Sequence, residues 1–196
     1  ELKNNGLDEN TIVVFTSDNG PWLIMKQEGG SAGLLREGKG STWEGGMREP
    51  CIFWSPGRIQ PGLVNQIGTT MDLFTTFSKL ANVPLPDDRK MDGTDLGPTL
   101  FEKKPSKRKE VFYYRGDELY AVRLGAFKAH FITEGAYGPP AREEHNPPLL
   151  FNLEVDPSEK FNVADSNLDI IEQIQALVKK HNSDLVKGED QLKARG

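Results

Sequence analysis

The stretch TIVVFTSDNG, residues 11–20, decides the fold class of this chain. Residues 11–16 form a short, continuous, largely β-branched run that ends at a turn, which is typical of a fully buried strand in a parallel sheet. The turn-forming residues Ser17 to Gly20 follow at the carboxyl end of that strand. Ligands of open α/β sheets gather at this edge. The stretch therefore predicts an α/β fold with a functional site directly after the strand.

A glycine-rich segment, residues 26–49, comes next and holds seven of the 20 glycines of the chain. It is too rich in glycine for a helix and too poor in β-branched residues for a long strand. Long loops in compact domains usually carry function, so we expect an ordered functional loop here. The apolar run Cys51 to Trp54 then predicts a second strand. Cys51 is the only cysteine, and we expect it to be buried in that strand rather than catalytic.

The remainder of the chain changes character near the Pro- and Lys-rich stretch 98–110. Before it, apolar residues at helical spacing predict an amphipathic helix over 70–80, followed by a loop over 83–98. After it, short alternating runs separated by turns predict an antiparallel sheet. These strands are expected at residues 111–114, 119–124, 127–133 and 149–153. A terminal helix from about residue 167 to Lys187 should pack on that sheet, so we divide the chain into residues 1–105 and 106–196.

Charge and composition exclude several classes of protein. The net charge of -5 gives no general reason to expect nucleic-acid binding. No apolar stretch approaches the roughly 18 residues that span a bilayer, and no secretory signal is visible. A single cysteine excludes an internal disulfide framework and a multi-cysteine zinc site. Residues 1–11 resemble the end of a helix, stopped by Gly6, that leads into a strand, so we expect the chain to begin in mid-fold.

Three residues near the first strand have the chemistry to bind ligands. Asp18 and Asn19 are adjacent oxygen donors, which hard cations such as Ca²⁺ accept, although Ca²⁺ takes six to eight oxygens. Spacing alone favours a turn stabilised by these side chains, without metal. Lys39 lies between Gly38 and Gly40, where the backbone can approach an oxyanion closely. A lysine at the tip of a flexible loop is an equal alternative.

The histidines are the remaining candidates for chemistry near neutral pH. His130 lies in an alternating strand and His145 in a loop, and either could bind substrate or transfer a proton, although a lone histidine is more often structural. His181 lies on the apolar face of the terminal helix and should be a packing residue. Arg48 and Glu49 precede a proline at a strand entry, where an ion pair that fixes the loop is favoured over catalysis.

Several motifs together resemble the type I sulfatases. The most specific is GKGSTWEGGMREP, residues 38–50, which follows TSDNG at residues 16–20; the first block alone would be a weak signal. Residues 91–96, MDGTDL, resemble its next landmark. Further similarities point to the branch of arylsulfatase A and N-acetylgalactosamine-6-sulfatase. They lie at residues 112–117, 127–131, 149–153 and 156–159.

The resemblance implies a fold, a set of site residues and a cofactor. The expected fold is the C-terminal part of an alkaline-phosphatase-like α/β sandwich, followed by a small antiparallel sheet with a packed C-terminal helix. Asp18 and Asn19 match Ca²⁺ ligands of the family, Lys39 matches a lysine that contacts the sulfate group, and His130 matches a histidine of the substrate pocket. The substrate would be a sulfated sugar or an aryl sulfate, with a preference for 6-sulfated N-acetylgalactosamine or galactose.

The family attacks the sulfur of its substrate with a formylglycine made in a Cys/Ser-x-Pro-Ser-Arg motif, and the 196 residues contain no such motif. No residue of this chain is therefore assigned as catalytic. The formylglycine and the remaining Ca²⁺ ligands are expected in a missing N-terminal part. We expect no sulfatase turnover by this chain alone, and weak Ca²⁺ binding or none.

Two other classes stay open. One is a non-catalytic module, derived from a sulfatase, that binds sulfated glycans; the beginning in mid-fold argues against it because a natural module should not expose the edge of a half-sheet. The other is a phosphatase or phosphodiesterase of the same superfamily, which the block at residues 38–50 disfavours. By resemblance, the compartment would be secreted, periplasmic or lysosomal.

Overall fold

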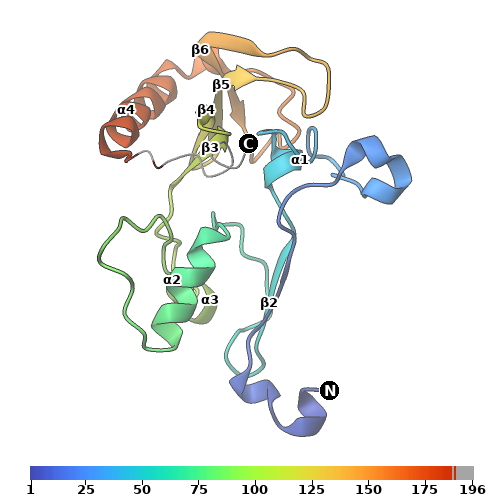
Figure 1. The fold of residues 1–196 in the computed structure, drawn as a ribbon, viewed down its shortest axis with the longest axis vertical. Helices are drawn as coiled ribbons and strands as arrows, with labels where there is room; N and C mark the ends of the chain where they lie inside the picture. The colour runs from blue at the N-terminus through green and yellow to red at the C-terminus, as the bar shows by residue number, and fades with distance from the viewer. Residues whose placement is uncertain (187, 189–196) are drawn as a thin grey trace.

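The computed structural model describes residues 1–186 and 188, which form two sheets joined by loops and short helices. A two-stranded sheet pairs β1 (Val13–Thr16) with β2 (Cys51–Trp54). A four-stranded antiparallel sheet has the order β3-β4-β5-β6. Its strands are β3 (Glu110–Arg115), β4 (Glu118–Leu124), β5 (Phe127–Thr133) and β6 (Glu143–Asn152). Figure 1 shows the larger sheet at one end of the molecule and the β1–β2 ribbon, with α2 and α3, towards the other.

The helices are short except for the last one. The α-helices are α1 (Glu44–Met47), α2 (Met71–Leu80), α3 (Gly97–Glu102) and α4 (Leu168–Asp184). The 3₁₀ segments are η1 (Lys3–Asn5), η2 (Asp8–Asn10), η3 (Leu23–Gly29) and η4 (Ala164–Ser166). Within the described part of the chain, every helix is too short or too polar to cross a membrane.

The core of the larger sheet lies between its strands and α4. Small and branched side chains from the central strands meet one face of α4, where Ile171 and Ile174 are buried at the i, i+3 spacing of a helix. The predicted antiparallel sheet and packed terminal helix are thus confirmed. The helix is shorter than predicted, and its predicted last residue, Lys187, lies outside the described residues. His181 stacks on Phe112 with the ring centroids 3.8 Å apart, as expected of a packing residue.

The β1–β2 ribbon corrects two predictions. Its strands are antiparallel, with Val13 opposite Trp54 and Thr16 opposite Cys51, and not parallel. Its side chains are also not fully buried, since Phe15 is 64% exposed and Cys51 is exposed. The physical reason is that no second layer of the described residues covers the ribbon. A continuous apolar run predicts that both faces of a strand are apolar. It does not predict which part of the protein, if any, packs against those faces.

Helix α2 forms as predicted but buries its polar face. Asp72 is fully buried and accepts hydrogen bonds from the backbone N–H groups of Thr69 and Thr94 and from the guanidinium of Arg108. Burial alone would raise the pKa of Asp72, but these hydrogen bonds and the Arg108 charge hold it below its usual value. Arg108 belongs to the basic stretch between the two predicted parts, so this ion pair ties the start of the second part to α2.

Candidate functional site

The candidate site is built by the long excursion of the chain between β1 and β2. This segment, residues 17–50, is called the excursion. Thr16 and Cys51 are partners in the β1–β2 ribbon, so the excursion begins and ends at the same end of the ribbon. Three backbone hydrogen bonds fold it back on itself, from Gly20 to Gly46, from Lys39 to Pro21 and from Gly45 to Arg36. The segment is therefore compact. It contains η3 and the single helical turn α1, which the prediction of a helix-free loop missed.

Glycine is required where these chain segments cross. A Cβ on Gly20 would lie 1.8 Å from the carbonyl oxygen of Gly45, and a Cβ on Gly38 would lie 2.4 Å from that of Pro21. Real Cβ atoms do not approach backbone so closely. The glycines therefore allow the backbone around Asp18 and the backbone around Lys39 to pack in direct contact.

Asp18 and Asn19 follow β1 directly, as the sequence predicts. Asp18 is exposed, Asn19 is half-buried, and the hydroxyl of Ser17 donates to the carbonyl of Asn19. The carboxyl of Glu49 lies near Asp18, because burial and then the charge of Asp18 raise the pKa of Glu49. Its Oε1 atom is buried and has no hydrogen-bond partner among the described residues. Two carboxylates and an amide thus gather at this edge, although the described residues contain no group of three acidic, His or Cys side chains able to hold a metal.

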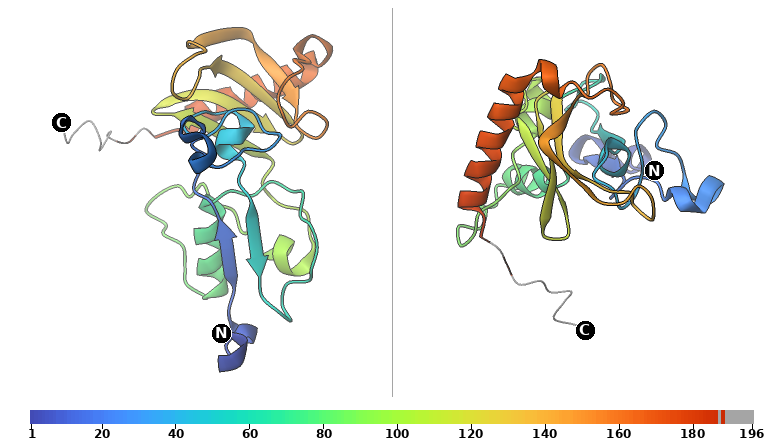
Figure 2. Two further views of the ribbon diagram at one scale, coloured as in Figure 1. Left: turned by 90° about the vertical axis from the view of Figure 1, so that its right-hand side faces the viewer. Right: turned by 90° about the horizontal axis from the view of Figure 1, so that it is seen from above.

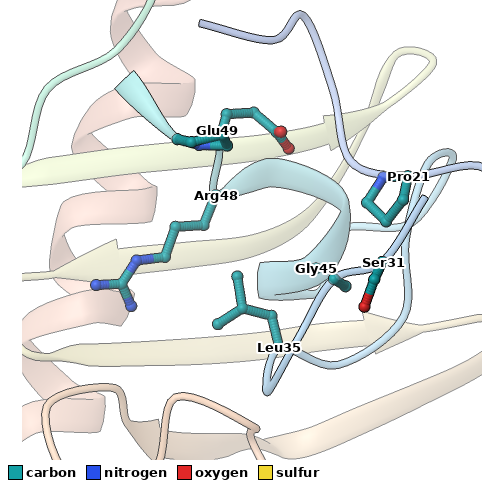
Figure 3. Close-up of a pocket in the computed structure, with 8 residues that line it drawn as sticks. Pro21, Ser31, Leu35, Gly45, Arg48 and Glu49 are labelled. Atoms are coloured by element: carbon teal, nitrogen blue, oxygen red, sulfur yellow. The ribbon is translucent and has the colours of Figure 1, made fainter. Parts of the chain in front are cut away.

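A hollow of about 300 Å³ lies beside this edge (Figure 3). Pro21, Ser31, Leu35, Gly45 and the Arg48–Glu49 pair line it, together with Ala32 and Pro50. In Figure 3 the side chains of Arg48 and Glu49 point in different directions. The guanidinium of Arg48 lies 3.8 Å from Glu44 instead, so the ion pair expected at this strand entry joins a different partner.

Lys39 presents a free cation on the same excursion. Its side chain is exposed, and its ammonium makes no ion pair with any described residue. The nearest aromatic ring is that of Trp22, whose centroid lies 5.6 Å from Nζ. Gly40 follows with φ of +89°, a conformation that favours glycine. Such a lysine can meet an oxyanion without first breaking an internal pair.

His130 lies elsewhere, inside a buried ionic cluster between the excursion and the sheet. We define the buried junction as Glu44, Lys128, His130 and Glu159, none of which is more than 1% exposed. The ammonium of Lys128 lies 3.0 Å from Glu44 Oε1 and 3.2 Å from Glu159 Oε1. His130 Nε2 lies 2.7 Å from Glu159 Oε1, and the backbone N–H of Glu44 donates to Glu159 Oε2 at 2.6 Å.

The protonation of the buried junction follows from these contacts. Burial lowers the pKa of His130 to about 4, even though the neighbouring Glu159 favours its charged form. Burial opposes ionisation of Glu159, but the hydrogen bond from His130 and the charge of Lys128 lower its pKa overall. Near neutral pH the ring is therefore neutral and donates its Nε2–H to an ionised carboxylate. Its Nδ1 is left without a hydrogen-bond partner among the described residues.

The buried junction anchors the glycine-rich segment on both sides of Lys39. On one side, Arg36 donates to the carbonyl of Glu159 at 2.9 Å and lies 3.7 Å above the Trp43 ring. On the other, Trp43 stacks on His130 with centroids 4.1 Å apart. Figures 1 and 2 show α1 and α4 on opposite sides of the larger sheet. The sheet thus holds α4 on one face and the excursion on the other.

The sequence predictions for the site have mixed outcomes. Asp18, Asn19 and Lys39 lie on one folded excursion, whereas His130 is fully buried behind it, and its predicted contact with substrate stays a prediction. His145 lies apart from both, with its Nε2 2.8 Å from the hydroxyl of Thr133. Sequence reasoning missed Glu44, Lys128 and Glu159. The available signal was Lys128, a charged residue between the apolar residues Phe127 and Ala129 of a predicted strand.

Comparison with known proteins gives consistent matches over nearly the whole chain. A family model described as Sulfatase matches residues 1–83, and one described as the C-terminal region of aryl-sulfatase matches residues 106–196. N-acetylgalactosamine-6-sulfatase of Canis lupus familiaris is 43% identical over 97% of this chain and 41% of its own length. Arylsulfatase A of Homo sapiens is 38% identical over 94% of this chain and 42% of its own length.

A solved structure agrees with these matches. The sulfatase PsFucS1 from Pseudoalteromonas sp. superimposes with a TM-score of 0.85 at 32% identity, covering 93% of this chain and 38% of that one. The chain therefore spans about two fifths of the length of the relatives it matches. The predicted alkaline-phosphatase-like α/β fold with its added antiparallel sheet is confirmed.

Proposed function

The chain belongs to the sulfatase family, and from this membership we propose that it supplies calcium-binding and sulfate-binding residues to an enzyme that hydrolyses sulfate esters. The observation that carries the proposal is the folding of the excursion. Lys39 N donates to Pro21 O at 2.9 Å, two residues after Asn19, so the free cation and the oxygen donors share one small piece of backbone.

The chemistry of these groups suits a sulfate ester. Its sulfate group carries negative charge on oxygens that must be held while the bond to the alcohol breaks. Fixed positive charge aimed at such oxygens is usually the largest single contribution to catalysis. The exposed ammonium of Lys39 would provide part of it, and the buried junction would keep the lysine's backbone in place.

Calcium binds oxygen donors of the kind that Asp18 and Asn19 provide, but it needs more ligands than these two residues supply. Asp18 and Asn19 would supply two oxygen ligands. A cation beside Asp18 would also offset the repulsion that, together with the larger effect of burial, raises the pKa of Glu49. The other ligands, and the formylglycine nucleophile, would come from sequence outside these 196 residues, which contain no Cys/Ser-x-Pro-Ser-Arg motif. When bound, the ion would help to neutralise the sulfate oxygens.

Turnover by the natural gene product that contains this chain tests the proposal. We expect it to release sulfate from 4-nitrophenyl sulfate much faster than phosphate from 4-nitrophenyl phosphate. Lys39→Ala should lower kcat/KM about 10²- to 10³-fold, the usual effect of removing one donor to a developing oxyanion. Lys104→Ala, which alters an exposed lysine paired with Glu102, is the matched control. Preference for the phosphate ester, or a Lys39→Ala enzyme as active as the control, would contradict the proposal.

A binding measurement tests calcium without relying on turnover. Adding Ca²⁺ to chelator-treated gene product should raise its thermal unfolding temperature, and Asp18→Asn should reduce that rise. Asp8→Asn, which changes a half-buried carboxylate in η2, serves as the control. An equal rise in the Asp18→Asn and Asp8→Asn proteins would remove Asp18 from the calcium site.

A further inference from the structure

We propose that Tyr137 and Trp22 form a stacking platform beside Lys39 on which the pyranose ring of a sulfated sugar rests while its sulfate meets the lysine. This inference rests on the proposed function and deepens it, since it selects a carbohydrate as the substrate class. The inference also gives the loop between β5 and β6, residues 134–142, a role in substrate binding.

Two aromatic rings and one cation converge on this place. The centroids of Trp22 and Tyr137 are 6.2 Å apart and their planes are inclined by 49°. The Lys39 ammonium lies 5.6 Å from the Trp22 centroid. A Cβ on Gly40 would lie 3.4 Å from Cε2, Cζ and the hydroxyl of Tyr137, so that ring lies directly against the residue after Lys39. Trp22 and Tyr137 are 41% and 51% exposed, so their faces are available to a ligand.

A hollow beside Tyr137 and Lys39 suits one sugar ring. It has a volume of about 160 Å³, and Glu37, Leu23, Ile24 and residues 136–139 complete its lining, while the Trp22 ring lies next to it against Tyr137. That volume is below the roughly 300–1,000 Å³ of sites that enclose drug-sized ligands. Glu37 can accept hydrogen bonds from sugar hydroxyls, while the ammonium of Lys39 complements the sulfate. A sulfated pyranose has a partner for each of its parts here. Its C–H face can lie on the aromatic ring, its hydroxyls can donate to Glu37, and its sulfate can meet Lys39.

The loop that carries Tyr137 is already held in place. The guanidinium of Arg115 donates to Glu134 Oε2 at 2.8 Å and to the carbonyls of Gly135 and Ala136. The hydroxyl of Tyr120 donates to the same Glu134 oxygen, also at 2.8 Å. A ring positioned before binding loses little conformational freedom when the sugar arrives, which favours recognition.

Steady-state kinetics of the gene product that contains this chain test the platform. With N-acetylgalactosamine 6-sulfate as substrate, Tyr137→Ala should raise KM roughly tenfold, since the stacking face is lost. Tyr137→Phe keeps the ring and should stay within about twofold of the unmodified protein. The exposed Phe161 lies outside the hollow, and Phe161→Ala is the aromatic control. Inorganic sulfate has no ring, so its inhibition constant should be unchanged by Tyr137→Ala.

The outcomes separate this inference from the proposed function. An unchanged KM for the sugar in Tyr137→Ala, alongside a large loss in Lys39→Ala, overturns the platform and leaves the sulfatase proposal standing. Equal weakening of the sugar and of inorganic sulfate would place Tyr137 at the anion site and also overturn it. If the protein releases no sulfate from any ester, the proposed function fails, and saturation-transfer NMR of the same sugar decides the platform. Ring-proton saturation that disappears in Tyr137→Ala supports it, and saturation equal in both proteins overturns it.

Discussion

Replacing Lys128 by Met should open the contact between the glycine-rich excursion and the larger sheet. Lys128 is fully buried, and its ammonium bridges Glu44 and Glu159 at 3.0 and 3.2 Å. Methionine fills most of the same space without charge. Glu44 keeps Arg48 and Arg123 at 3.8 and 4.0 Å. Glu159 retains only the neutral His130 and a backbone N–H, so it becomes a buried carboxylate without a countercharge.

The size of the effect follows from that uncompensated charge. Removing one member of a buried ion pair costs about 3–5 kcal/mol, whereas an exposed pair contributes about 0–1 kcal/mol. The contact is local, so the loss should be seen as local opening rather than only as global unfolding. Since about 1.4 kcal/mol changes an equilibrium tenfold, amide hydrogens near the buried junction should exchange at least roughly 100-fold faster.

Hydrogen exchange read by mass spectrometry on peptides covering residues 41–46 and 127–133 would measure this opening. Lys90→Met is the matched control, because Lys90 is 72% exposed and its ammonium lies 3.8 Å from the carboxylate of Asp184, which is 63% exposed. Adding Glu159→Gln to Lys128→Met should restore much of the protection against hydrogen exchange, because the double variant no longer contains the unpaired Glu159 carboxylate. Exchange within threefold of the control in Lys128→Met, or no recovery in the double variant, would refute the electrostatic reasoning.

Two further predictions concern the same region. Gly20→Ala should destabilise the excursion by about 1–3 kcal/mol or more, because the added Cβ would lie 1.8 Å from the carbonyl oxygen of Gly45. Gly68→Ala is the control, since its Cβ would lie 3.6 Å from the nearest atom, and it should leave the thermal unfolding temperature unchanged. The second concerns pH. Because the pKa of His130 falls from 6.5 to about 4 in the folded protein, the unfolded state binds the extra proton between these values. Stability should therefore decline as the pH falls from about 6.5 to 4, and His130→Gln should flatten this part of the unfolding profile; a parallel profile would count against a buried neutral ring.

Much of the fold was predictable because it depends on local patterns. Alternating apolar residues and turns located β3, β4 and β5, and helical spacing located α2 and α4. The pairing of β1 with β2 was not predictable, since direction depends on how the connecting excursion returns. Exposure was not predictable either, because periodicity identifies an apolar face and not the layer against it.

The site was predictable only where its residues are neighbours in sequence. Glycines on either side of Lys39, and the turn after β1 at Asp18 and Asn19, gave direct signals. The buried junction gave almost none, because Glu44 lies 84 residues from Lys128 and 115 from Glu159. Strand β5 is also covered on both faces, so the alternation that normally marks solvent is absent from its burial pattern.

The two faces of the larger sheet have different roles. Towards α4 it presents Val122, Ala129 and Leu150, an apolar surface that tolerates small shifts of packing. Towards the excursion it presents Lys128 and His130 from the same strand, and their bonds demand one alignment of donor and acceptor. An apolar contact of equal area would often be at least as stable. An ionic contact therefore fixes the position of the backbone more strictly than an apolar one, and under the proposed function such a fixed backbone would serve Lys39. The charged face of the sheet is also the face that holds the excursion, through Arg36 and Trp43 on either side of Lys39.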